Sequence, residues 1–117
     1  MPSEVNRFNK EQLTPYFEQW EVVREQIELL YHQKDRRAVE LMQEAITNYQ
    51  ELLEYGGKTI DERKGTAVYT LLPLNGEERF EFVQAKIASH YAFVQLDALF
   101  TETKKKAARL RLALLRK

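Results

Sequence analysis

The chain has 117 residues, a length that fits one domain and is short for two. Hydrophobic residues make up 44% and charged residues 31%, a globular composition that argues against disorder over the whole chain. The chain has no cysteine, which excludes disulfides, thiolate metal sites and cysteine nucleophiles and fits a reducing, cytoplasmic compartment. We expect no signal peptide and no membrane span, because no apolar run reaches the roughly 18 residues that a span needs.

The formal net charge of zero conceals an uneven distribution of charge along the chain. Residues 1–103 contain 11 Lys and Arg against 18 Asp and Glu, whereas residues 104–117 contain seven basic residues and no acid. An acidic body with a basic end points to an interaction partner.

The first predicted helix follows a mostly polar stretch. Residues 1–13 are expected to form a partly ordered lead-in. Thr14-Pro15 predicts the helix start, because Thr can cap free backbone N–H groups and Pro is tolerated at the first helical position. The apolar residues that follow recur at spacings of three and four, which places them on one helix face: Tyr16, Trp20, Val23, Ile27 and Leu30.

A second helix is predicted from Asp35, a plausible cap, to Gly56-Gly57, where glycine can adopt the left-handed conformation that ends a helix. The same alternating spacing defines its apolar face: Val39, Met42, Ile46, Tyr49 and Leu53. The connection to the first helix is short, so the two should run antiparallel.

Residues 58–74 are less regular. Residues 67–72 have a β-like composition without an obvious pairing strand, so we expect an ordered crossover with a short strand or a helical turn.

Asn75 and Glu78 have the spacing of a capping box for a third helix. Its apolar positions are Phe80, Val83 and Ile87. A break near residues 88–90 precedes a long fourth helix with the apolar face Phe93, Leu96, Phe100, Thr103, Ala107, Leu110 and Leu114. The pattern predicts one all-α domain over residues 1–117, a four-helix bundle with an irregular crossover between helices two and three.

Three short stretches carry a family resemblance: LPLNGEERF at residues 72–80, SHYAFVQL at 89–96 and LFTETK at 99–104. Over roughly residues 72–106 the chain resembles the YpoC-like family, small helical proteins of Bacillus-type bacteria. The resemblance implies a cytoplasmic helical protein without an assigned reaction, and it transfers no catalytic residue. Family members tend to be encoded beside DNA replication and repair genes, which slightly favours a nucleic-acid-linked role.

Carboxylate metal chemistry finds little support in the sequence, and we expect neither a metal nor a cofactor. A dinuclear site in a helical bundle needs inward-facing Glu-x-x-His pairs, whereas Glu28 and His32 are four residues apart and His90 lacks a suitable Glu. We interpret the two histidines as helix-terminal residues rather than as a metal or acid–base pair. Most acids of the first two helices lie opposite the apolar faces and should face water: Glu18, Glu21, Glu25, Glu28, Glu40, Glu44, Glu51 and Glu54.

Other catalytic patterns are also missing, because there is no Gly-x-Ser-x-Gly elbow and no glycine-rich phosphate loop. Arg79 has two interpretations: it pairs with a surface glutamate, which we favour, or it binds an anion or a buried carboxylate. An enzyme that uses His90 and Arg79 is the least favoured class of function, since no set of residues fills the geometric roles of an active site.

The basic end of the last helix is the strongest interaction signal. Cations stabilise a helix C-terminus and can pair with the acidic helices, so part of the charge needs no partner. Leu112 and Leu115, however, lie outside the apolar face and among the cations, which predicts a surface that something else covers. The candidate partner surface consists of Lys104, Lys105, Lys106, Arg109, Arg111, Leu112, Leu115, Arg116 and Lys117.

We therefore predict a non-enzymatic helical interaction or accessory protein whose partner is another protein or a second copy. The alternative is a nucleic-acid-associated factor that contacts phosphates through these cations. Protein contact is favoured because the basic segment has no aromatic residue for base stacking and the acidic body would repel a polyanion.

Overall fold

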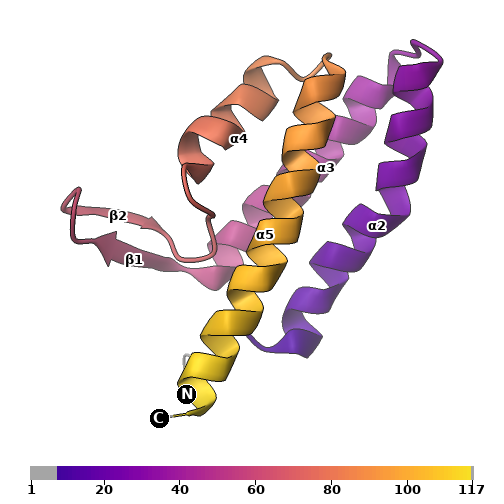
Figure 1. The fold of residues 1–117 in the computed structure, drawn as a ribbon. Coiled ribbons are helices and arrows are strands. Elements are labelled where there is room, and N and C mark those ends of the chain that lie inside the picture. The colour runs from indigo at the N-terminus through magenta and orange to yellow at the C-terminus, as the bar shows by residue number, and fades with distance from the viewer. Residues whose placement is uncertain (1–7, 117) are drawn as a thin grey trace.

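The computed structural model describes residues 8–116. They form the elements α2 (Lys10–His32), α3 (Arg37–Gly56), β1 (Lys58–Asp61), β2 (Thr66–Tyr69), α4 (Gly76–Ala85) and α5 (His90–Leu115) (Figure 1). The described part of the chain is mostly helical, as the sequence predicts, and a small hairpin is added to the expected all-α class.

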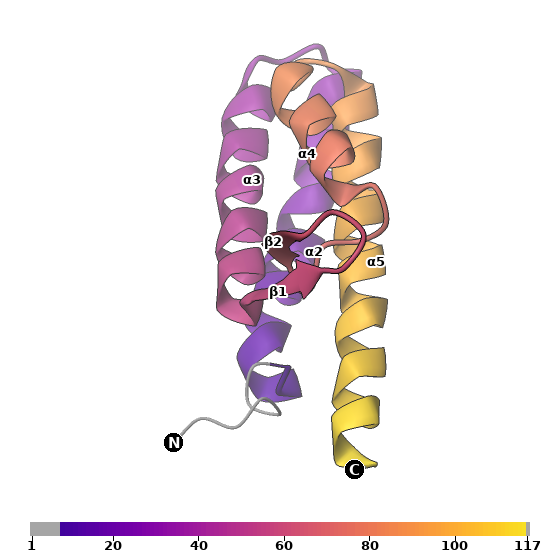
Figure 2. The ribbon, with the colours of Figure 1, turned by 90° about the vertical axis from the view of Figure 1, so that its left-hand side faces the viewer.

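The long helices α2, α3 and α5 lie side by side, and α2 and α3 run antiparallel (Figure 1). The short α4 packs on the N-terminal half of α5. Seen from the side, the hairpin lies between the C-terminal end of α3 and the middle of α5 (Figure 2). In both views the last turns of α5 extend beyond the hairpin and the end of α3.

The start of α2 corrects the prediction from Thr14-Pro15. The helix begins at Lys10, and the side chain of Asn9 caps it by accepting a hydrogen bond from the backbone N of Glu11 at 2.8 Å. Pro15 lies inside the helix, and the Thr14 hydroxyl donates to the Lys10 carbonyl at 2.5 Å. Asn9 is the stronger cap, and a proline near the helix start costs only one backbone hydrogen bond.

The predicted lead-in over residues 1–13 is also corrected where the structure describes it. Leu13 and Phe17 are buried in the core on the first turns of α2, and Phe8 packs beside them. Their burial offsets the hydrogen bond that the proline lacks. The part of the lead-in before residue 8 lies outside the described residues.

The ends of α3 lie close to where the sequence places them. Asp35 Oδ1 accepts a hydrogen bond from the backbone N of Arg37 at 2.9 Å, so the predicted cap residue does bind the first turn, although the N-cap position itself is Arg36. At the other end Gly57 has φ of 76°, a left-handed conformation that favours glycine.

The short strand that the sequence allows within residues 58–74 is present as β2, and β1 supplies the pairing strand that the sequence does not reveal. Lys58 pairs with Tyr69 and Asp61 with Thr66 in an antiparallel register. The turn is closed by Asp61, whose Oδ1 accepts from the backbone N of Arg63 at 2.9 Å, and by Gly65, which has φ of 67°. The residues of β1 are almost all exposed, so this strand lacks the apolar alternation that would have revealed it.

The predicted capping box at Asn75 is wrong, although α4 begins beside it at Gly76. Asn75 has φ of 57°, and its side chain makes no capping hydrogen bond. A residue whose side chain caps a helix typically has an extended backbone, whereas the backbone of Asn75 is left-handed. The predicted break before α5 is confirmed, because Ser89 caps that helix by accepting from the backbone N of Tyr91 at 3.1 Å.

The core lies between the helices and is centred on aromatic residues. Trp20 stacks on Phe100 with 4.8 Å between ring centroids, and Tyr49 meets the same ring edge-on at 4.9 Å. The predicted apolar face of α5 is confirmed, with its first five residues buried and Leu110 and Leu114 packed partly against the core.

Candidate interaction surface

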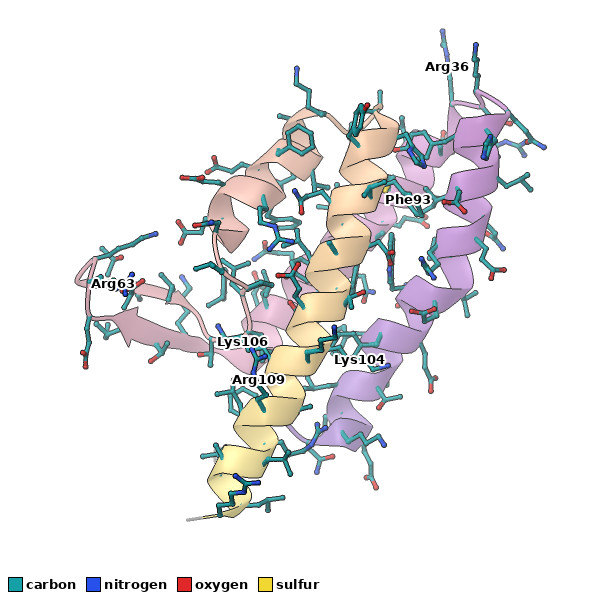
Figure 3. The ribbon with its side chains drawn as sticks, viewed as in Figure 1. Arg36, Arg63, Phe93, Lys104, Lys106 and Arg109 are labelled. Atoms are coloured by element: carbon teal, nitrogen blue, oxygen red, sulfur yellow. The ribbon has the colours of Figure 1, made fainter. Side chains whose placement is uncertain are left out.

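The predicted partner surface is divided into three parts by the elements that flank α5. Lys105, Lys106 and Arg109 face the hairpin, whereas Lys104 and Arg111 border α2 (Figure 3). The third part, Leu112, Leu115 and Arg116, is exposed at the end of the helix. Lys117 lies outside the described residues.

The groove between the hairpin and α5, here called the hairpin groove, has a volume of about 680 Å³. Its basic residues are Arg63, Lys64, Lys105, Lys106 and Arg109, and its acidic residues are Asp61, Glu77, Glu78 and Glu102. Sequence reasoning missed Arg63 and Lys64, because only the pairing of the two strands brings their turn toward α5. The signal that could have found them is the basic pair directly before Gly65.

Lys106 has a structural role in this groove. Its Nζ donates to the backbone carbonyl of Leu72 at 2.8 Å and so ties α5 to the segment that follows β2. Burial lowers the pKa of Lys106, and the neighbouring positive charge of Arg109 lowers it further. The ammonium group of Lys106 is therefore already engaged within the chain and is less available to a partner.

The groove between α2 and α5, here called the α2 groove, has a volume of about 360 Å³. Glu18 and Glu21 line it from α2, and Lys104 and Arg111 line it from α5. Arg111 donates through one of its terminal guanidinium nitrogens to the carbonyl of Phe8 at 2.8 Å. Acidic and basic side chains thus border one groove from opposite sides.

The end of α5 has the exposed leucines that the sequence predicts. Leu112 is 53% exposed and Leu115 is 65% exposed, with Arg116 exposed beside them. Exposed large apolar side chains at neighbouring positions of one helix form a small hydrophobic patch.

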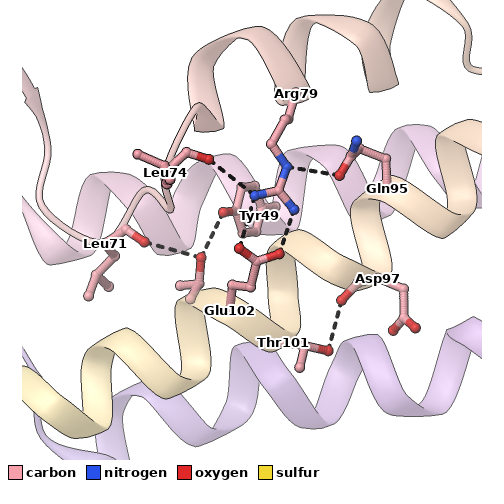
Figure 4. A network of polar contacts seen from close by, with 9 residues as sticks. Tyr49, Leu71, Leu74, Arg79, Gln95, Asp97, Thr101 and Glu102 are labelled. Atoms are coloured by element: carbon pink, nitrogen blue, oxygen red, sulfur yellow. Dashed lines mark hydrogen bonds and ion pairs between the residues drawn. The ribbon is translucent and has the colours of Figure 1, made fainter.

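Arg79 pairs with a glutamate, which is the favoured of its two predicted interpretations. Its guanidinium makes two hydrogen bonds to the carboxylate of Glu102, at 2.9 and 2.5 Å, and others to the Gln95 side chain and the Leu74 carbonyl (Figure 4). Hydrogen bonding to Arg79 lowers the pKa of Glu102, and the same bonds raise the pKa of Arg79. The pair joins α4 to α5.

His32 and His90 both line one depression of about 480 Å³, together with Asp35. This arrangement favours the enzyme hypothesis more than the sequence alone does. The Asp35 carboxylate, however, is engaged by the guanidinium of Arg37 at 2.7 to 3.2 Å. These hydrogen bonds lower the pKa of Asp35 to about 2. The ring of His90 packs edge-on against Tyr31.

The acidic stripes of α2 and α3 face water, as predicted for all eight glutamates. Over residues 8–116 no group of three or more His, Asp or Glu side chains is placed to hold a metal ion.

Fold and surface together define a small, mostly helical protein with a basic, leucine-bearing end on its last helix. No described helix is long and apolar enough to cross a membrane. The chain belongs to the YpoC-like family: the model of that family, described as YpoC-like protein, matches residues 10–114. The match therefore extends from α2 nearly to the end of α5, well beyond the stretch that carries the resemblance in the sequence. No curated protein and no solved structure matches the chain.

Proposed function

We propose that this chain is a non-enzymatic interaction or accessory protein whose helices, arranged as a four-helix bundle, present the end of α5 to another protein. The observation that carries the proposal is the exposure of Leu112 and Leu115, 53% and 65%, on turns that extend beyond the hairpin and the end of α3. A cytoplasmic location stays a prediction.

The energetic argument favours an apolar contact with basic flanks. Full burial of a leucine side chain contributes about 1.5 to 3 kcal/mol, whereas an exposed ion pair contributes at most about 1 kcal/mol. We therefore expect the two leucines to supply affinity and the cations to supply orientation and association rate.

The test is affinity capture from cells with the wild-type protein and with Leu112→Ser/Leu115→Ser. Ile60→Ser is the matched control, because Ile60 is 63% exposed on β1 and lines none of the three depressions described above. We expect proteins captured by the wild type to be lost from the double variant and retained by the control. Equal capture by all three proteins would contradict the proposal.

Contact with nucleic acid is the second candidate, and the hairpin groove favours it, because Arg63 and Lys64 add to the cations of α5 there. The four carboxylates in the same groove oppose it, since they would repel phosphates. Binding of labelled single-stranded and duplex DNA at low and moderate salt separates the two functions. Phosphate contact requires salt-sensitive binding that Arg63→Glu/Arg109→Glu abolishes.

A further inference from the structure

We propose that the protein which covers the end of α5 is a second copy of this chain. In this dimer two copies pack through the outer face that α2 and α5 share, with α5 of each copy antiparallel to α2 of the other. The basic end of α5 in each copy then lies against the acidic stripe of α2 in the other. The inference rests on the proposed function, because it uses the same exposed leucines.

The acidic half of the contact is the outer stripe of α2. Its four glutamates, Glu18, Glu21, Glu25 and Glu28, are exposed on successive turns of the helix. Two large apolar side chains lie beside these acids, Val22 at 71% and Leu29 at 56% exposure. Arg24, the one cation among these turns, pairs with Asp97 of α5 at 2.9 Å and, more loosely, with Glu21 at 3.8 Å. This stripe is therefore both acidic and partly apolar.

The basic half is the last third of α5. Ala108, Leu112 and Leu115 follow each other at spacings of four and three, so they share one stripe of the helix. Lys104 and Arg111 lie on one side of this stripe, and Lys105, Arg109 and Arg116 lie on the other. No acidic residue follows Glu102. The end of α5 therefore presents apolar side chains flanked by cations, which are complementary to the apolar side chains flanked by acids on α2.

The α2 groove shows that the two halves belong to one face of the molecule. Glu18 and Glu21 border it opposite Lys104 and Arg111. Within residues 8–116 no ion pair of 4.0 Å or less crosses the groove between these acids and these cations. The charges across the groove are therefore complementary and do not pair with each other, although Glu21 lies 3.8 Å from Arg24 and Arg111 donates to the Phe8 carbonyl.

The directions of α2 and α5 are compatible with a two-fold symmetric dimer. The helices α2 and α5 are antiparallel (Figure 1), so a two-fold axis that lies in the interface and runs parallel to the helices can place the α5 end of each copy over α2 of the other. Each contact is then made twice and the assembly closes as a dimer. The 23 residues of α2 span about 34 Å. Two such helices roughly 10 Å apart present an area on the order of the 800 Å² per partner of a standard interface.

The test is charge reversal combined with sedimentation velocity across micromolar concentrations at low and high salt. The α5 variant is Lys105→Glu/Arg109→Glu/Arg116→Glu, and the α2 variant is Glu18→Lys/Glu25→Lys/Glu28→Lys. All six residues are exposed, so both variants should fold, which far-ultraviolet circular dichroism checks. The matched control is Glu40→Lys/Glu44→Lys/Glu51→Lys, which makes the same change in charge on α3.

We expect a wild-type dimer whose dissociation constant rises with salt, and a control that dimerises like the wild type at moderate salt. The α5 variant alone and the α2 variant alone should each dimerise with a dissociation constant at least tenfold higher than that of the wild type. In either variant the two surfaces that meet at each contact carry charges of the same sign. An equimolar mixture of the two should recover the dimer, because opposite charges again face each other at both contacts.

A wild-type chain that stays monomeric under all conditions would overturn the dimer. So would variants that dimerise like the wild type, or folded variants whose mixture stays monomeric. If the chain is monomeric but Leu112→Ser/Leu115→Ser still loses captured proteins, the proposed function stands and only the second copy is excluded.

Discussion

Thr103 of α5 and Tyr49 of α3 are joined by a hydrogen bond of 2.7 Å between their hydroxyl groups in the core. The Thr103 hydroxyl also donates to the backbone carbonyl of Leu71 at 3.1 Å, so it accepts from Tyr49. Burial raises the pKa of Tyr49, which keeps this phenol protonated as the donor. One small side chain thus links α3, α5 and the segment after β2.

We expect Thr103→Val to destabilise the protein more than Tyr49→Phe. Valine keeps the shape of threonine but leaves both the Tyr49 hydroxyl and the Leu71 carbonyl without a partner, at a cost of about 1 to 3 kcal/mol for each group. Phenylalanine at position 49 leaves the Thr103–Leu71 bond intact and should cost about 1 kcal/mol. Urea unfolding measures both free energies, with Thr103→Ser as the variant that keeps the hydroxyl. The reverse order would show that the direction of donation is wrong.

Arg79→Met is expected to lower the free energy of unfolding by roughly 1 to 3 kcal/mol, because it removes hydrogen bonds between α4 and α5. Glu102→Gln should have a smaller effect, since the Glu102 side chain is 43% exposed and solvent screens the pair.

The contribution of Glu102 should depend on pH in a defined direction. Its folded pKa is lowered, so the stabilisation is complete above the ordinary value of about 4.3 and is lost as pH falls through the lowered pKa. The difference in stability between wild type and Glu102→Gln should thus be largest near neutral pH and narrow in acid. Chemical unfolding at several pH values measures it, and a difference that grows in acid would refute the assignment.

Gly56→Ala should destabilise the junction of α3 and the hairpin. A Cβ atom at this position would lie 2.6 Å from the Cδ1 atom of the Leu71 side chain, which is itself fully buried. Overpacking of this kind costs about 1 to 3 kcal/mol. Gly65→Ala is the matched control, because a Cβ there meets no atom within 4 Å and only the φ of 67° is strained. Thermal unfolding compares the two, and equal losses would argue against a close contact at Gly56.

Leu112→Ser and Leu115→Ser should change the free energy of unfolding by less than about 0.5 kcal/mol each, because both side chains are largely exposed. Phe100→Ala, on the buried face of the same helix, should cost about 3 to 5 kcal/mol. Such a contrast, measured by urea unfolding, would show that the leucine variants used in the binding tests are folded. A large loss of stability at Leu112 would instead place that side chain in the core.

The periodicity of the sequence was sufficient to predict the helices and most of their buried faces. Trp20, Tyr49 and Phe100 all lie where the spacing of three and four places them, because burial of one helix face is a local property of a helix. The exposure of Leu112 and Leu115 and of the glutamate stripes could be predicted for the same reason. The end of α3 could also be predicted from the sequence, because a glycine can adopt the positive φ that stops a helix whatever its surroundings.

Only the tertiary structure decided which elements meet. The pairing of Lys58 with Tyr69, the partner of Arg79 and the division of the basic end into two grooves and an exposed tip all depend on residues from distant parts of the chain. Side-chain spacing along one segment carries no information about such contacts, because they arise from packing of whole elements. The sequence by itself thus determined a helical chain with an acidic body and a basic end, and the packing of α2 against α5 decided that acid and base share one face.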